Sequence, residues 1–148
     1  MSLNNLELEN LISKAISNKK QNWRYAWELN QLSKEKISLI NWNIELIIDS
    51  LDCKKDGHQR ELLKLLLKLK IKKNLTTKLW DCCLKIWLNI NKQSSVRIKA
   101  FEHLVNISIE YPDLKNEIFL LTKNEHIDIL SKGIRISTYK KLNSKLKN

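Results

Sequence analysis

The residues of this chain that could carry out chemistry are its histidines and cysteines, because these side chains bind metal ions and act as nucleophiles or bases. No histidine has a second His or Cys at metal-ligand spacing. Cys82 and Cys83 are adjacent, so from a helix they cannot both point at one ion. We therefore expect no metal site and no cofactor. The three histidines are His58, His103 and His126.

Catalytic motifs give the same expectation. The sequence has neither a Gly-rich phosphate loop nor a Gly-x-Ser-x-Gly nucleophile motif. We expect no catalytic residue, and the spacing leaves open only a Cys–His pair that folding would bring together.

The five tryptophans could instead stack on a ligand. Trp80 and Trp87 are seven residues apart on one apolar helix face, which favours packing in the core over stacking on a base. Trp23 and Trp27 are four residues apart on one face of a helix near the start of the chain. We expect these two rings to be partly exposed.

Lysines form the strongest candidate for a binding surface. Lys64, Lys68 and Lys72 are four residues apart and would form a strip along one helix. Ammonium groups in such a strip could bind an acidic partner or a phosphate backbone. A strip of this kind would equally keep a leucine-rich helix soluble, and both interpretations stay open.

The charge of the chain is strongly positive and unevenly distributed. The formal net charge is +11, and residues 53–99 carry +10 while residues 1–52 carry −1. Residues 100–131 carry −4 and residues 132–148 carry +6. A basic block attracts nucleic acid or acidic proteins. The 23 lysines against 4 arginines also fit a composition in which lysine is the favoured surface residue, since arginine is the preferred reader of phosphates.

The composition also bears on location. The first residues lack the basic and apolar regions of a signal peptide, and no run of about 18 uncharged apolar residues could span a membrane. The odd number of cysteines argues against a disulfide framework. We expect a cytoplasmic protein that does not bind membranes.

Helices must position these residues, because two Gly and one Pro leave too few turn residues for an all-β chain. Apolar residues recur at spacings of three and four throughout, which indicates amphipathic helices. The sequence predicts eight helices in four pairs: residues 3–18 with 22–33, 35–52 with 57–72, 75–91 with 94–110, and 113–124 with 132–146.

Two helix starts show capping signals. Asp56 and Gln59 have the spacing of a capping box, in which each side chain bonds the backbone of the other residue. Ser94 and Ser95 are suited to cap the helix that follows them.

The four arginines recur at intervals of 36, 37 and 38 residues, which indicates a structural repeat. Each is predicted in the first turn of the second helix of its pair. A cation is disfavoured at a helix N-terminus, so an acid or carbonyl in the turn of the neighbouring helix pair should hold it. The four residues are Arg24, Arg60, Arg97 and Arg135.

The segment from Val96 to Leu104, Val-Arg-Ile-Lys-Ala-Phe-Glu-His-Leu, resembles the second helix of a HEAT repeat, in which Val-Arg is followed by Ala and Leu at these offsets. The segments around the other three arginines resemble it in part. The resemblance implies an all-α, right-handed solenoid of about four antiparallel helix pairs, in one domain over residues 1–148. It also implies that the acid preceding the repeat arginine is present as Asp56.

In such a solenoid the second helices line the concave side, where Lys99 and Lys140 could extend the strip of Lys64, Lys68 and Lys72. We expect a non-enzymatic scaffold whose concave face binds an acidic protein or peptide. Sequence-tolerant nucleic-acid binding is the first alternative. The second alternative is an alkylpurine DNA glycosylase, because HEAT-like members of that class use tryptophans and an Asp on a basic face, as Trp80 and Asp81 could.

Overall fold

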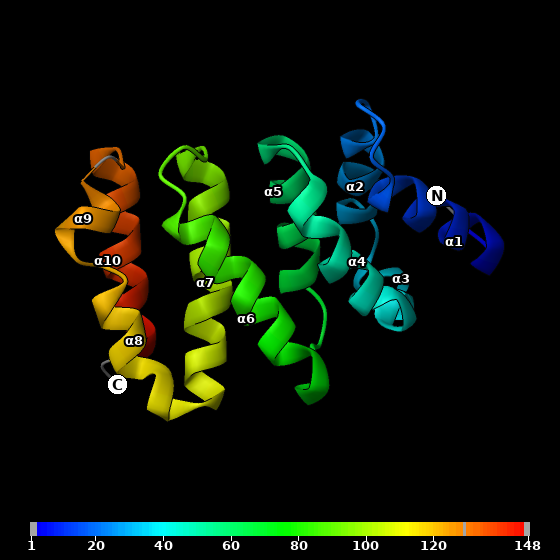
Figure 1. Ribbon diagram of the computed structural model, residues 1–148. Coiled ribbons are helices and arrows are strands. Elements are labelled where there is room, and N and C mark those ends of the chain that lie inside the picture. Colours follow the sequence, from blue (N-terminus) through cyan, green and yellow to red (C-terminus); the bar gives the residue numbers. More distant parts are fainter. Residues whose placement is uncertain (1–2, 129, 147–148) are drawn as a thin grey trace. The chain divides into compact units, whose positions relative to one another are not determined.

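The computed structural model describes residues 3–128 and 130–146, and these residues are helical or in connectors, with no strand. Figure 1 shows the succession of helices. The elements are α1 (Asn5–Ile16), α2 (Trp23–Asn30), α3 (Lys34–Ser38), η1 (Leu39–Asn43), α4 (Ile44–Ser50), η2 (Leu51–Cys53), α5 (Asp56–Leu67), α6 (Lys73–Leu88), α7 (Ser94–Glu110), η3 (Pro112–Leu114), α8 (Lys115–Leu120), α9 (Asn124–Ile127) and α10 (Lys132–Leu146).

The chain divides into two compact units within the first turn of α6. The N-terminal unit ends at Leu75 and the C-terminal unit begins at Thr76. The assignment of residues 1–148 to one domain with four helix pairs stays a prediction.

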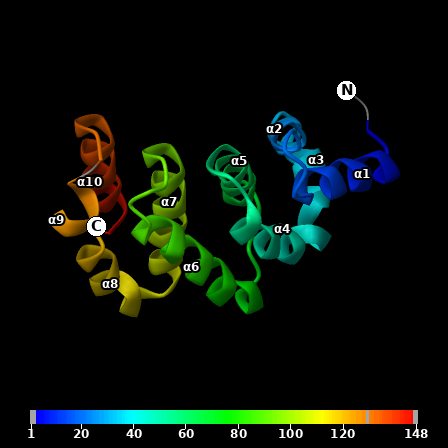
Figure 2. The same ribbon diagram turned by 45° about the horizontal axis from the view of Figure 1, so that its top comes forward.

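In the N-terminal unit, α2 packs against both α1 and α5 (Figures 1 and 2). α1 begins with a capping box, because the Asn4 side chain accepts the Glu7 amide hydrogen and the Glu7 carboxylate accepts that of Asn4. The faces that meet are buried and mainly apolar, which stabilises a set of helices too short to be stable alone. Between α2 and α5, the buried Asn30 amide also donates to the Glu61 carbonyl at 2.8 Å. Their core includes Leu8, Ile12, Ala15, Ala26, Leu29, Leu62, Leu63, Leu65 and Leu66.

The helix predicted over residues 35–52 is interrupted. Its apolar residues are buried as predicted, including Ile37, Ile40 and Ile44. The backbone, however, passes from α3 through the 3₁₀ turn η1 into α4. Asn41 and Asn43 lie in this turn, and asparagine favours turns over helix interiors because its amide competes for backbone hydrogen bonds.

The helix predicted over residues 113–124 is also shorter than expected. Pro112 opens the 3₁₀ turn η3, and α8 ends at Leu120. The Thr122 hydroxyl donates to the Phe119 carbonyl at 2.8 Å, so the chain turns there. A separate short helix, α9, follows.

Both predicted caps in the middle of the chain are wrong. α5 begins at Asp56 itself, and its N-cap residue makes no side-chain capping bond. The Gln59 amide instead donates to the Leu51 carbonyl at 2.8 Å, because burial of Gln59 demands a partner within the core. α7 begins at Ser94 with Gln93 at its N-cap position, again without a side-chain capping bond.

The core of the C-terminal unit is built around Arg97, which is completely buried. Its Nε donates to the Trp87 carbonyl at 2.8 Å and its Nη2 donates to the His126 carbonyl at 2.6 Å. Its guanidinium lies 4.8 Å from the centre of the Trp87 ring, and that ring packs on Phe101 at 4.7 Å between centroids. The Trp87 indole nitrogen donates to the Leu121 carbonyl at 2.9 Å. The prediction that a carbonyl in the turn of the neighbouring helix pair holds the arginine is confirmed for Arg97 by the His126 carbonyl.

α7 also packs against α10. Glu102 on α7 accepts from Lys141 on α10 and forms an ion pair with Lys99 at 3.3 Å. One turn further along, Lys145 donates to the Asn106 side chain at 3.0 Å. Polar contacts therefore fix the alignment of these two helices along one edge.

Candidate functional site

The lysine strip predicted on one helix is not formed as expected. α5 ends at Leu67, so Lys68 is its C-cap residue and Lys72 lies in the connector to α6. The Lys68 ammonium donates to the Asn30 carbonyl at 2.9 Å, and burial lowers the pKa of Lys68. Lys64 forms an ion pair with Glu61 at 3.4 Å. Lys72 lies over the Trp42 ring, so all three ammonium groups have partners within the N-terminal unit.

The predicted extension of the strip lies in the C-terminal unit. Lys99 on α7 is held by Glu102, so its charge is partly neutralised. Lys140 is exposed on α10. A continuous strip through all five lysines stays a prediction.

The repeat arginines occupy different environments. Each lies near the start of the helix predicted for it, but only Arg97 is fully buried. Arg24 is exposed and lies over the Trp23 ring, while Arg60 is half-buried and lies 3.7 Å from Glu61. Arg135 is half-buried in the first turn of α10. The regular spacing therefore marks equivalent helix starts rather than equivalent contacts.

The N-terminal unit carries three aromatic rings that each have a cation above them. Arg24 lies 5.9 Å from the centre of the Trp23 ring, and Lys14 lies 5.2 Å from that of Tyr25. Lys72 lies 5.9 Å from the centre of the Trp42 ring. Trp42 is 89% exposed and Trp23 is 42% exposed. We call Trp23, Tyr25 and Trp42, with their cations, the aromatic–cation pairs.

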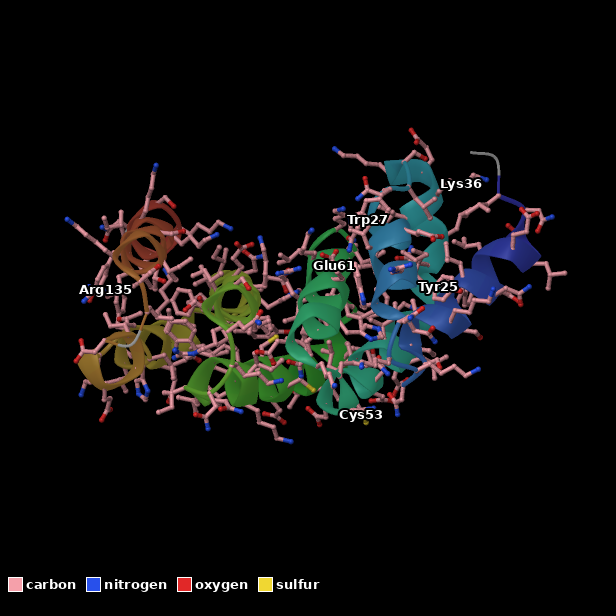
Figure 3. The ribbon with its side chains drawn as sticks, turned by 90° about the horizontal axis from the view of Figure 1, so that it is seen from above. Tyr25, Trp27, Lys36, Cys53, Glu61 and Arg135 are labelled. Carbon is pink, nitrogen blue, oxygen red and sulfur yellow. The ribbon has the colours of Figure 1, made fainter. Side chains whose placement is uncertain are left out.

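A groove of about 480 Å³ lies between α1 and α2. Tyr25 and Trp27, which Figure 3 labels on α2, line it together with Leu11. The partial exposure predicted for Trp23 and Trp27 is confirmed, since Trp27 is 47% exposed. The groove is mainly apolar, with Glu7, Lys14 and Glu28 among its lining residues.

A second hollow of about 570 Å³, the connector pocket, lies where the α1–α2 connector meets the chain entering α5. Both connectors lie at the upper end of the N-terminal unit in Figure 1. The lining contains five Lys or Arg side chains and no Asp or Glu. The lining residues are Asn18, Lys19, Lys20, Trp23, Cys53, Lys54, Lys55, Gly57, His58 and Arg60.

Two buried side chains, Lys54 and His58, join the chain around the start of α5 to the end of α1 and the connector that follows it. The Lys54 ammonium donates to the Ile16 carbonyl and to the Asn18 side-chain oxygen. The His58 Nε2 contacts the Ala15 carbonyl, which can only accept, so this nitrogen carries the hydrogen. Burial lowers the pKa of both Lys54 and His58. His58 is therefore neutral near pH 7.

Of the residues considered for metal binding or catalysis, Cys53 and His58 line the connector pocket, and the others lie outside it. Among residues 3–128 and 130–146, no group of three or more His, Cys, Asp or Glu side chains could hold a metal ion. Trp87 is buried, Trp80 is half-buried and Asp81 is exposed on α6. Burial raises the pKa of the Cys83 thiol well above its ordinary value, which keeps that thiol protonated.

Within the described part of the chain, no helix is both long enough and apolar enough to cross a membrane.

Paired helices with apolar contact faces and a buried arginine at a helix start define an α-helical repeat protein. The HEAT repeat domain family matches residues 3–145, and the chain belongs to this family. HEAT repeats serve generally as scaffolds for protein interaction. No curated protein and no solved structure matches the chain.

The sequence did not single out Trp42 or the connector pocket. The asparagines on either side of Trp42 were a usable signal, because they favour a turn and a turn exposes the residue within it. The connector pocket had no local signal, since Lys19 and Lys20 are separated from Lys54 and Lys55 by more than thirty residues.

Proposed function

We propose that this chain is a non-catalytic scaffold that binds an acidic protein or peptide segment through its N-terminal unit. The aromatic–cation pairs carry the proposal. A ring beneath a cation offers apolar contact area and positive charge at the same point, which suits a partner with an apolar side chain beside a carboxylate. Tryptophan, tyrosine and arginine are also the residues most often responsible for the affinity of an interface.

The groove between α1 and α2 supports the proposal. Its volume of about 480 Å³ falls within the range of pockets that bind small ligands or single side chains. Trp27 and Tyr25 would receive an apolar side chain of the partner there. The net charge of +11 would attract an acidic segment before contact is made.

Selection from a displayed library of random peptides, with the full chain as bait, tests this proposal. We expect enrichment of peptides that combine Asp or Glu with an apolar residue. Trp42→Ser should weaken a selected peptide by roughly tenfold, as expected for a residue central to an interface. Leu46→Ser is the matched control, because Leu46 is an exposed apolar residue of the same unit and is not one of the aromatic–cation pairs.

Enrichment of basic or uncharged peptides would contradict the acidic partner. Equal weakening by Trp42→Ser and Leu46→Ser would contradict the role of the aromatic–cation pairs.

Sequence-tolerant nucleic-acid binding is the competing function, favoured by the lysines of the connector pocket. Measuring the binding of labelled single-stranded and double-stranded oligonucleotides over a salt series distinguishes nucleic-acid binding from the binding of an acidic peptide. Phosphate-backbone binding must weaken steeply as salt rises, with a slope set by the number of contacted phosphates. We expect neither oligonucleotide to bind as tightly as the selected peptides at moderate salt.

We further propose that about four helix pairs stack as a right-handed solenoid whose second helices line a concave face. The match to HEAT repeats over residues 3–145 supports this arrangement, because helical repeats of this family stack with a constant turn. Solution X-ray scattering of the full chain tests it: an elongated particle is expected, and a spherical one would overturn it.

A further inference from the structure

We propose that the connector pocket binds a phosphate monoester, presented as a phosphorylated side chain of the partner. This inference rests on the proposed scaffold function and assigns a ligand class to one place on it. The pocket is built entirely within the N-terminal unit, from the segments 18–23 and 53–60. Figure 3 places Cys53, one of its lining residues, at the edge of that unit.

The charge of the pocket is the first argument. Lys19, Lys20, Lys54, Lys55 and Arg60 line it, and no carboxylate does. His58 adds no charge near pH 7, because burial lowers its pKa. Lysine side chains that line one hollow repel each other, and an anion between them relieves this repulsion. The pocket is thus arranged for a ligand with more than one negative charge.

The buried ammonium of Lys54 is the second argument. Lys54 is only 6% exposed, and both of its hydrogen-bond acceptors, the Ile16 carbonyl and the Asn18 amide oxygen, are uncharged. A buried cation without a counter-ion is costly. An anion in the pocket would supply the missing negative charge, so ligand binding and the protonated state of Lys54 would favour each other.

The kind of anion follows from charge and shape. A phosphate monoester carries between −1.5 and −2 charges at neutral pH and has three strong acceptor oxygens, whereas a carboxylate carries one charge. Lysines bind phosphate as point charges. The Nε of Arg60 lies 3.7 Å from Glu61, and the two other nitrogens of its guanidinium can donate two parallel hydrogen bonds to the phosphate. Trp23 provides an apolar wall in the same pocket, on which the chain that carries the phosphate can rest.

The volume of the pocket supports a phosphorylated side chain. About 570 Å³ exceeds the space needed by a phosphate alone, so it leaves room for the side chain and neighbouring backbone that present it. The N-terminus of α5 lies at the pocket through Gly57, where an added side chain would meet no atom within 4 Å. Its partial positive charge adds to that of the side chains.

Fluorescence anisotropy with the full chain and a labelled phosphoserine peptide tests the inference. The same peptide with serine or glutamate in place of phosphoserine measures the contribution of the phosphate, and inorganic phosphate serves as a competitor. Lys20→Gln with Lys55→Gln removes two exposed cations of the pocket. Lys34→Gln with Lys70→Gln is the matched control, because it removes the same charge from exposed lysines of the same unit outside the pocket.

We expect the phosphoserine peptide to bind tightest and inorganic phosphate to displace it. The pocket variant should weaken binding by roughly tenfold or more, as expected for the loss of charge-assisted hydrogen bonds, while the control variant should bind almost normally. Equal affinity for the serine peptide would overturn the inference, and so would equal weakening by the control variant. Tighter binding of a labelled oligonucleotide than of the phosphoserine peptide would also overturn it, in favour of phosphodiesters.

Comparing the phosphoserine peptide with the acidic peptides selected from the library shows whether a failure concerns this inference or the proposed function. If the phosphoserine peptide fails while acidic peptides bind and depend on Trp42, only the connector-pocket inference is wrong. If the phosphoserine peptide binds while no acidic peptide is selected, the scaffold proposal is wrong and the pocket binds a phosphate monoester for another purpose.

Discussion

At the scale of single residues, arginine and lysine play different parts in this chain. Arg97 is completely buried and donates to the carbonyls of Trp87 and His126. Its planar guanidinium has several donors and can therefore bond two carbonyls at once. Lys54, also buried, joins two neutral oxygens with a single ammonium. One residue type fixes the core of the C-terminal unit, and the other joins two connectors of the N-terminal unit.

Arg97→Met should lower the free energy of unfolding by roughly 3 kcal/mol, because two carbonyls lose charge-assisted hydrogen bonds while the volume is largely kept. Urea unfolding followed by circular dichroism measures the change. Arg24→Met is the control, since Arg24 is exposed and its replacement should change stability by less than about 0.5 kcal/mol. Equal effects of the two substitutions would show that the buried guanidinium has no special role.

Glu102 makes stability depend on pH. Burial raises the pKa of this carboxyl, but the hydrogen bond from Lys141 and the charges of Lys99 and Lys141 outweigh burial, so the pKa is below its usual 4.5. The carboxylate therefore contributes stability above pH 4.5, and this contribution is lost as the pH falls through the lowered value. Glu102→Gln should reduce stability at pH 7 by about 1.5 kcal/mol.

The same substitution should flatten the loss of stability on acidification. Urea midpoints of the wild-type and Glu102→Gln chains at pH 7 and pH 3 measure it. A constant difference between the two chains at both pH values would contradict the assignment.

At the scale of elements, the capping box at the N-terminus of α1 can be tested by a single substitution. Asn4→Ala should remove one capping bond and cost about 1 kcal/mol, since alanine cannot accept the Glu7 amide hydrogen. Amide hydrogen exchange should show faster exchange in the first turn of α1. Asn5→Ala is the control, because Asn5 lies inside the helix, where alanine is a better helix former.

The elements also show how far the sequence predicts the fold. Ile37, Ile40 and Ile44 are buried as their spacing of three and four residues predicts, although the backbone between them is a 3₁₀ turn. Periodicity reports which side chains face the core, and it tolerates a local change of helix type. The end of α5 was not predictable in this way. Lys68 caps it and bonds the carbonyl of Asn30, 38 residues earlier in the chain.

For the candidate site, too, the sequence predicts some features and not others. Partial exposure of Trp23 and Trp27 followed from their position on one face of a helix. The connector pocket could not be predicted, because its lysines come from two connectors whose approach depends on the packing of α1, α2 and α5. Side chains on loops gather according to tertiary structure, which a single sequence reports only weakly.

At the scale of the whole molecule, the net charge of +11 opposes folding, because like charges come closer together in the compact state. Added salt screens this repulsion over distances near 10 Å at about 0.1 M. We expect the thermal midpoint to rise when sodium chloride increases from low to moderate concentration. A fall in the midpoint would instead show that ion pairs such as Glu61 with Lys64 dominate the electrostatics.

The distribution of tryptophans gives each unit its own optical signature. Trp87 lies beneath a guanidinium and against Phe101, fully shielded from water, so its fluorescence should be blue-shifted and resistant to acrylamide quenching. Trp23, Trp27 and Trp42 are exposed in the N-terminal unit, so their emission should be red-shifted and readily quenched. Half-buried Trp80 of the C-terminal unit adds a partly quenchable background. A change in the readily quenched emission can therefore report a partner arriving at the N-terminal unit, while the resistant emission of Trp87 reports the integrity of the C-terminal unit in the same sample.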